Sequence, residues 1–113
     1  MSEKLQELTR KRKLAHSELM KRGSKVYEAF LKMEEAAYSN GALAKKNKEL
    51  IAVGISVVIN CESCMQWHIE QSFQDGATES EILEAIEVGI EMGGGPATVS
   101  ARFALEVLNS LKK

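Results

Sequence analysis

Two cysteines and a histidine share one short stretch, Cys61-Glu62-Ser63-Cys64-Met65-Gln66-Trp67-His68. Residues three and four apart lie on one helix face, so all three groups share a stripe if the helix begins at or before Cys61. A helix N-terminus favours a thiolate, because its partial positive charge and unpaired N–H groups stabilise negative charge. Histidine can hold the thiol proton near neutral pH, and a second thiol can resolve a mixed disulfide. The pattern predicts dithiol redox chemistry, with Cys64 attacking within reach of His68, although Cys61 lies nearer the helix tip.

Two other interpretations of this stretch stay open. A structural zinc site normally has four ligands. Cys61, Cys64 and His68 supply three, and His16, interpreted as a surface or interface residue, is distant in sequence. The thiols could instead be inert core residues beside a packed histidine. A stabilising disulfide is a weak explanation, because closing a four-residue loop contributes at most ~2 kcal/mol in the chain-entropy model. Because a fourth zinc ligand is missing near the motif, dithiol chemistry is favoured over a metal site, and we predict no metal and no other cofactor.

Glu49 heads the apolar segment Leu50-Ile51-Ala52-Val53. A carboxylate at such a place is usually a solvated charge in the first turn of a helix, where the helix dipole stabilises it. Alternatively, it points inward and orients a histidine, as a proton relay requires. Periodicity alone favours the solvated arrangement.

Six helices and no strands are predicted to position these residues. Apolar spacing, capping residues and glycine breaks place them at about 2–21, 24–39, 44–60, 61–75, 78–92 and 96–111. The third is almost wholly apolar from Leu50 to Ile59 and is expected to be central. Short connections imply antiparallel neighbours, so the predicted fold class is all-α, a compact six-helix bundle.

Glycines mark further features of these helices. Asn40-Gly41 is expected to end the second helix in the left-handed conformation. Gly54 and Gly89 lie inside predicted helices, where they indicate close helix contacts.

Length and composition limit the class of protein. The 113 residues fit a single domain, predicted as an N-terminal helix over 1–25 and a core bundle over 26–113. Hydrophobic residues make up 44% of the chain, which excludes disorder over its whole length. No apolar run reaches the ~20 residues that span a bilayer, and the charged N-terminus lacks a signal-peptide core. We therefore expect a cytoplasmic protein with no membrane partner.

Charge gives no reason to expect a nucleic-acid partner. The net charge is −1, and the basic run Arg10-Lys11-Arg12-Lys13 contains no aromatic residue. A solvated helix face, or one leg of an oligomer, is the favoured interpretation of this run.

Four segments form a recognisable set: Lys48-Glu49-Leu50-Ile51-Ala52, the Cys61–His68 stretch, Gly76-Ala77-Thr78-Glu79-x-Glu81-Ile82 and Met92-Gly93-Gly94-Gly95-Pro96. This set resembles the carboxymuconolactone decarboxylase family, and more narrowly its alkylhydroperoxidase D-like branch. The resemblance covers about 27–111. Its most specific part is the motif E-x11-C-x-x-C-x-x-x-H, in which four residues agree in type and spacing.

The resemblance implies a fold of the alkylhydroperoxidase D-like type, a homo-oligomer (trimer or hexamer) and an oxidoreductase. It implies that Cys61 and Cys64 are a redox pair and that Glu49 and His68 relay protons, which reverses the solvated interpretation of Glu49. The implied substrate is a peroxide or small disulfide, and the implied reductant is a dithiol, lipoyl or thioredoxin-like. Ser63 stands where the family's best-known peroxidase has a histidine, a difference that bears on the tuning of the thiol.

Two other functions remain as alternatives. A lyase that decarboxylates a small carboxylated lactone would need cationic residues in its pocket, and Arg102 is the lone candidate. The lactone decarboxylases of the wider family generally lack the cysteine pair. The third possibility is a non-catalytic helical module that binds zinc or a partner chain.

Overall fold

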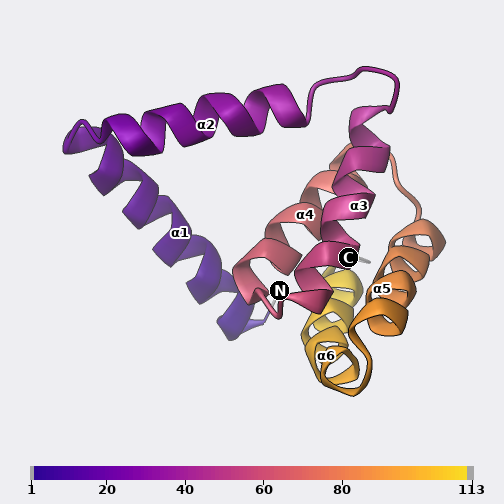
Figure 1. Ribbon diagram of the computed structural model, residues 1–113. Coiled ribbons are helices and arrows are strands. Elements are labelled where there is room, and N and C mark those ends of the chain that lie inside the picture. The colour runs from indigo at the N-terminus through magenta and orange to yellow at the C-terminus, as the bar shows by residue number, and fades with distance from the viewer. Residues whose placement is uncertain (1, 112–113) are drawn as a thin grey trace. The chain divides into compact units, whose positions relative to one another are not determined.

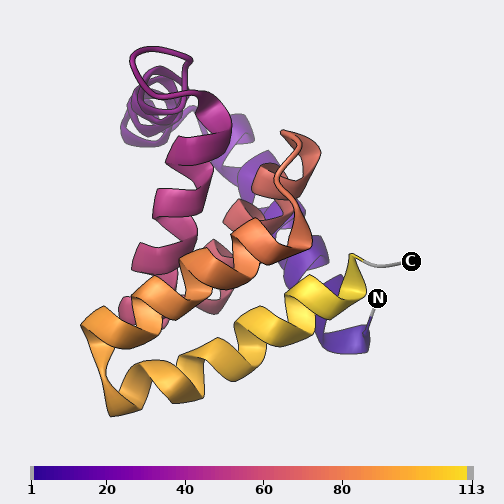
Figure 2. The same cartoon turned by 90° about the vertical axis from the view of Figure 1, so that its right-hand side faces the viewer.

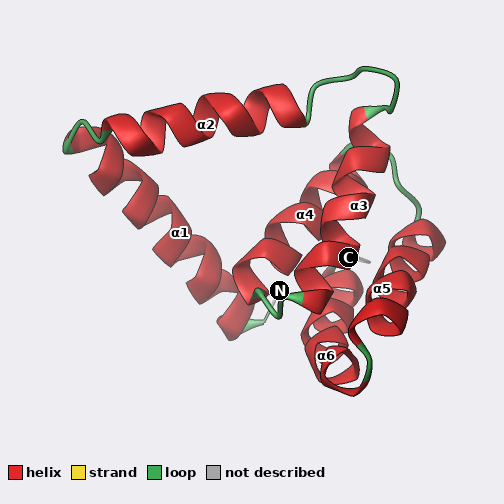
Figure 3. Cartoon of the chain, in the orientation of Figure 1, coloured by secondary structure: helices red, strands yellow, loops and turns green. Residues whose placement is uncertain are grey.

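The computed structural model describes residues 2–111, and within this range it contains six helices and no strands (Figures 1 and 3). The predicted all-α fold class is confirmed, and the predicted helix ends agree to within about two residues. Met1, the first residue of the predicted N-terminal helix, and residues 112–113, the last of the predicted core bundle, lie outside the described range. The helices are α1 (Glu3–Lys21), α2 (Lys25–Ala37), α3 (Lys45–Val58), α4 (Glu62–Gln74), α5 (Glu79–Gly93) and α6 (Gly95–Ser110).

The chain divides into two compact units, Met1–Asn40 and Gly41–Lys113. The single domain expected over residues 1–113 stays a prediction. In the first unit, α1 and α2 are joined at Gly23, whose positive φ of 65° suits a residue without a side chain. The Ser24 side chain accepts a hydrogen bond from the backbone N–H of Tyr27 and caps α2, as predicted. Between the two helices, His16 Nδ1 lies 2.6 Å from the Tyr27 hydroxyl.

The second unit is built around α3, which packs against α4, α5 and α6. The prediction that this apolar helix is central is therefore confirmed. Burying a side chain of the size of Val, Ile or Met contributes about 1.5–3 kcal/mol. Fully or almost fully buried apolar residues of these types come from all four helices: Val53, Val57, Met65, Ile69, Ile82, Ile86 and Val107.

A close contact between α3 and α5 depends on two glycines. A Cβ atom added to Gly89 would lie 2.6 Å from the carbonyl oxygen of Gly54 and 2.9 Å from Cβ of Val57. The predicted close helix contact at Gly54 and Gly89 is thus confirmed.

The helix ends agree with most of the predicted capping. Thr78 and Glu81 form the expected capping box at the start of α5. Figure 2 shows α5 and α6 meeting at the turn after α5, where Gly94 has a φ of 71°. The left-handed ending predicted at Asn40-Gly41 is wrong, because neither residue is among those with positive φ. Helix α2 ends earlier, and the Gly41 N–H instead donates to the Leu43 carbonyl at 3.0 Å within the loop.

None of the helices in residues 2–111 combines the length and apolar character needed to cross a bilayer.

Candidate active site

Cys61 and Cys64 lie at the N-terminus of α4 and are joined by a disulfide bond, with their Cα atoms 5.1 Å apart. Cys61 is the N-cap residue, in extended backbone (φ −100°, ψ 101°), and Cys64 occupies the first turn. The Cys64 N–H points to Cys61 Sγ at 3.1 Å. Cys61, Cys64 and His68 would share one helix face only if the helix began at or before Cys61, but α4 begins at Glu62. The extended N-cap takes Cys61 off the helical spacing and allows the two sulfurs to bond.

His68 follows Cys64 by one helical turn on α4, and its ring is held by Glu49 of α3. His68 Nδ1 lies 2.7 Å from Glu49 Oε1, and the two side chains are only 14% and 3% exposed. The solvated arrangement that periodicity favoured for Glu49 is wrong, because the packing of α3 on α4 encloses this carboxylate. A hydrogen bond through Nδ1 sets the orientation of the imidazole and determines which ring nitrogen carries the proton.

Two residues that sequence reasoning missed complete this cluster. Lys45 Nζ lies 3.2 Å from Glu49 Oε2 and 2.7 Å from Oδ2 of Asp75, the residue directly after α4. Burial lowers the pKa of Lys45, but hydrogen bonds to Asp75 and Glu49 outweigh burial, so its pKa is raised overall. The i, i+4 spacing of Lys45 and Glu49 was a signal in the sequence. Asp75 lies 30 positions from Lys45, and no local pattern connects them.

The order of these groups follows from the antiparallel packing of α3 and α4. The short loop joins the end of α3 to Cys61, so the start of α3 lies beside the end of α4, as the Lys45–Asp75 contact requires. On α4, the buried Met65 and Ile69 anchor the helix in the core. Cys64 and His68, each one position before these anchors, are partly exposed. The disulfide thus lies at one end of α4, the Lys45–Asp75 pair at the other, and His68 between them.

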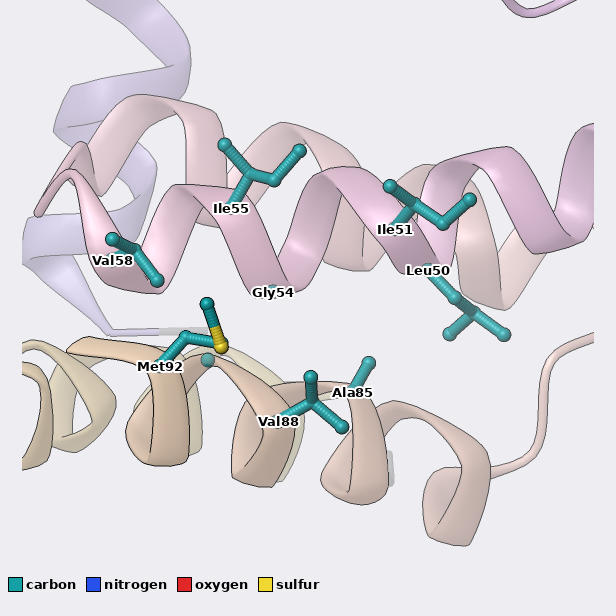
Figure 4. Close-up of a pocket in the computed structure, with 9 residues that line it drawn as sticks. Leu50, Ile51, Gly54, Ile55, Val58, Ala85, Val88 and Met92 are labelled. Atoms are coloured by element: carbon teal, nitrogen blue, oxygen red, sulfur yellow. The ribbon is translucent and has the colours of Figure 1, made fainter. Parts of the chain in front are cut away.

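A second feature of this unit is an apolar groove between α3 and α5, with a volume of about 530 Å³. Figure 4 shows side chains of both helices facing the space between them. The lining contains no thiol and no titratable group, so the groove offers a surface for contact rather than for chemistry. It is lined by Leu50, Ile51, Gly54, Ile55, Val58, Ala85, Val88, Gly89 and Met92.

The remaining candidate residues lie apart from this cluster. His16 belongs to the first unit, where it contacts Tyr27. Ser63 is exposed in the first turn of α4, and Arg102 is exposed on α6. Within the described range, no three His, Cys, Asp or Glu side chains are arranged to hold a metal ion.

Comparison with known proteins places this geometry in a family. The model of the carboxymuconolactone decarboxylase family matches residues 24–107. A protein of the cox locus of Paracoccus denitrificans, itself uncharacterised, is 37% identical over 97 residues, which cover 86% of this chain and 87% of that protein. An uncharacterised protein of Cupriavidus necator is 37% identical over 83 residues, which cover 74% of each chain.

Solved structures show the same fold. A carboxymuconolactone decarboxylase family protein from Legionella pneumophila superposes with a TM-score of 0.92 at 32% identity, covering 99% of this chain and 100% of that one. A family protein from Thermotoga maritima superposes with a TM-score of 0.85 at 28% identity, covering 94% and 90%. The Thermotoga protein has been described as a candidate participant in an antioxidative response.

Proposed function

The chain belongs to the carboxymuconolactone decarboxylase family, and we propose that it is a thiol-dependent oxidoreductase of the alkylhydroperoxidase D-like type. One observation carries the proposal: a cysteine pair at a helix N-terminus lies one turn from a histidine that a buried glutamate holds. The description of the Thermotoga relative supports an antioxidant role for this chain. The proposed substrates are a peroxide or a small disulfide, and the proposed location is the cytoplasm, where dithiol reductants are maintained.

In the proposed cycle the reduced enzyme attacks through Cys64. His68 takes the Cys64 proton, and the thiolate attacks one peroxide oxygen, breaking the O–O bond. The proton is returned to the departing alkoxide, which leaves as an alcohol, and Cys64 becomes a sulfenic acid. The Cys61 thiol then attacks the Cys64 sulfur and releases water, which gives the Cys61–Cys64 disulfide. Glu49 holds the imidazole during both proton transfers.

Return to the dithiol needs two electrons and two protons from outside the chain. A lipoyl or thioredoxin-like dithiol supplies both by thiol–disulfide exchange and becomes a disulfide itself. With a disulfide substrate, the same two cysteines pass two electrons and two protons to the substrate, which leaves as two thiols. No cofactor takes part in either form of the cycle.

The test is peroxide consumption by purified protein with a dithiol reductant, for the native chain and for Cys61→Ser and Cys64→Ser. Both variants should lose turnover, because each removes one sulfur of the disulfide that the cycle must close. Cys64→Ser should also lose the single, stoichiometric reaction with peroxide, while Cys61→Ser should keep it. Full turnover by either variant would show that the dithiol cycle is wrong.

Alkylation of the reduced protein provides the control for the other functions. A thiol-dependent oxidoreductase is inactivated when both cysteines are blocked. A lyase that decarboxylates a carboxylated lactone would keep its activity after alkylation. A zinc-binding module would show stoichiometric zinc in metal analysis of the reduced protein and no turnover of either substrate.

We also propose that the protein works as a homo-oligomer, a trimer or hexamer, in which a second copy covers the groove between α3 and α5. Ile51, Ile55, Val88 and Met92 are 52–72% exposed there. A second apolar stripe, Val26, Phe30 and Met33 on α2, is 50–82% exposed and offers a helix of matching character. Two such surfaces on one chain favour another copy of the chain as the occupant.

A further inference from the structure

We propose that Lys45, held by Asp75, is a positioning residue that fixes the Glu49 carboxylate and sets the pH at which His68 exchanges its proton. This inference rests on the proposed function, because it assigns a third member to the same proton relay. Lys45 touches neither sulfur in any contact that the structure gives. It acts through Glu49, whose other oxygen is bonded to His68.

The geometry assigns one task to each oxygen of the Glu49 carboxylate. Oε1 lies 2.7 Å from His68 Nδ1, and Oε2 lies 3.2 Å from Lys45 Nζ. A carboxylate held from both sides cannot rotate without losing one of these contacts. The imidazole that depends on Oε1 is therefore positioned by the ammonium on Oε2.

Because the Glu49 carboxylate is buried, the positive charge of Lys45 is needed to compensate its negative charge. The Glu49 side chain is 3% exposed, and an enclosed carboxylate is costly unless an opposite charge or a set of hydrogen bonds compensates it. Lys45 is a permanent cation beside it, whereas His68 is a cation only when protonated. Lys45 thus compensates Glu49 while His68 is neutral, which is the state that accepts a proton from a thiol.

Asp75 keeps the ammonium in place. Its Oδ2 is the closer partner of Lys45 Nζ, at 2.7 Å, and it approaches from the end of α4 rather than from α3. The Lys45 side chain therefore joins α3 to the same helix that carries His68. This fixes Lys45 more firmly than an i, i+4 pair on a solvated helix surface would.

Charged groups lie on every helix of this unit, and those of α6, which packs on α3 and α4, are the exposed Arg102 and the partly exposed Glu106. Helix α3 contributes Lys45 and Glu49, and the end of α4 contributes Asp75. Elsewhere on α4, Glu70 accepts a hydrogen bond from Gln66.

The next lysine on α3, Lys46, forms an ion pair toward α5: its Nζ lies 3.2 Å from a carboxylate oxygen of Glu81 and does not pair with Glu49. Lys46 has the same charge, one position along the same helix, and is a matched control.

The experiment is an NMR titration of the histidine rings in the full-length protein with the disulfide intact. Removing a cation beside Glu49 strengthens proton binding by the Glu49–His68 pair. In Lys45→Met the His68 midpoint should therefore move to higher pH by about one unit, a tenfold change in proton affinity. Lys45→Arg should restore the native midpoint. Asp75→Asn removes an anion and leaves Lys45 with Glu49, so the midpoint should move to lower pH.

Two controls come from the same chain. Lys46→Met should leave the His68 midpoint unchanged, and His16, whose ring contacts Tyr27, should titrate identically in all variants. The opposite signs for Lys45→Met and Asp75→Asn separate an electrostatic role from simple loosening, which would move both in the same direction. An unchanged midpoint in Lys45→Met, or an equal shift in Lys46→Met, would overturn the inference.

This titration does not depend on turnover. If the peroxide and thiol assays show no activity but the titration shifts appear as expected, the proposed function is rejected and the role of Lys45 is supported. Turnover by the cysteine pair without these shifts would reject the role of Lys45 alone.

Discussion

At the scale of single residues, Glu49 is the side chain whose environment departs most from its local sequence. The sequence favoured a solvated glutamate in the first turn of its helix, but Glu49 lies beyond the first turn of α3, where it is buried and shared between Lys45 and His68. Such a group is retained at a cost in desolvation, and its orientation of an imidazole offers a functional reason for that cost.

A Glu49→Gln substitution tests this role. The amide keeps the shape of the side chain but removes its charge, so His68 loses the anion that stabilises its protonated form. We expect oxidation of the reduced cysteines by peroxide to slow by about 10²-fold at neutral pH, the lower end of the usual contribution of acid–base catalysis. Timed thiol quantification measures the rate. A rate equal to that of the native protein would remove Glu49 from the relay.

At the scale of elements, α3 and α5 pack closely together, and Gly89 is the more crowded of the two glycines in their contact. Because α3 also carries Lys45 and Glu49, a shift of this contact would also move these two residues of the proposed relay. The packing of α3 on α4 then decides how far His68 lies from Glu49.

Gly89→Ala should destabilise the protein by ~1–3 kcal/mol, since the added methyl group would meet the Gly54 carbonyl and Val57. The free energy of unfolding in urea is the measurement. Gly95→Ala is the matched control, because no atom lies within 4 Å of a Cβ built there. Equal stabilities of the two variants would contradict the close contact.

At the scale of the whole molecule, the apolar groove is the main feature that chemistry within one chain does not explain. Its exposed side chains would gain part of the about 1.5–3 kcal/mol that full burial of such a side chain gives, because they are already partly buried within the chain. A second copy is the proposed cover, and the cysteine site itself lies outside the groove lining.

Ile55→Glu should dissociate the proposed oligomer, because it places a charge in the lining of the groove. Sedimentation equilibrium gives the mass of the species in solution. Val99→Glu is a matched control, since Val99 is 54% exposed, like Ile55 at 55%, but does not line the groove. A native protein that sediments at 12.5 kDa would refute the oligomer.

The sequence by itself determined the helices and the two cysteines proposed as the redox pair. Helical periodicity, the Thr78 capping box and the glycine breaks act within a few residues, so local spacing was enough to find all six helices described between residues 2 and 111. The C-x-x-C-x-x-x-H stretch is equally local. The prediction at Asn40-Gly41 failed because helix α2 ended earlier, where competing loop hydrogen bonds decide the outcome.

Only the tertiary structure decided which charges meet. Glu49 and His68 are 19 positions apart, and Lys45 and Asp75 are 30 apart, on helices whose relative rotation no short sequence window encodes. Whether a carboxylate faces water or an imidazole depends on how α3 packs on α4. The thiols were therefore visible in the sequence, whereas the network proposed to control their protons arises from that packing.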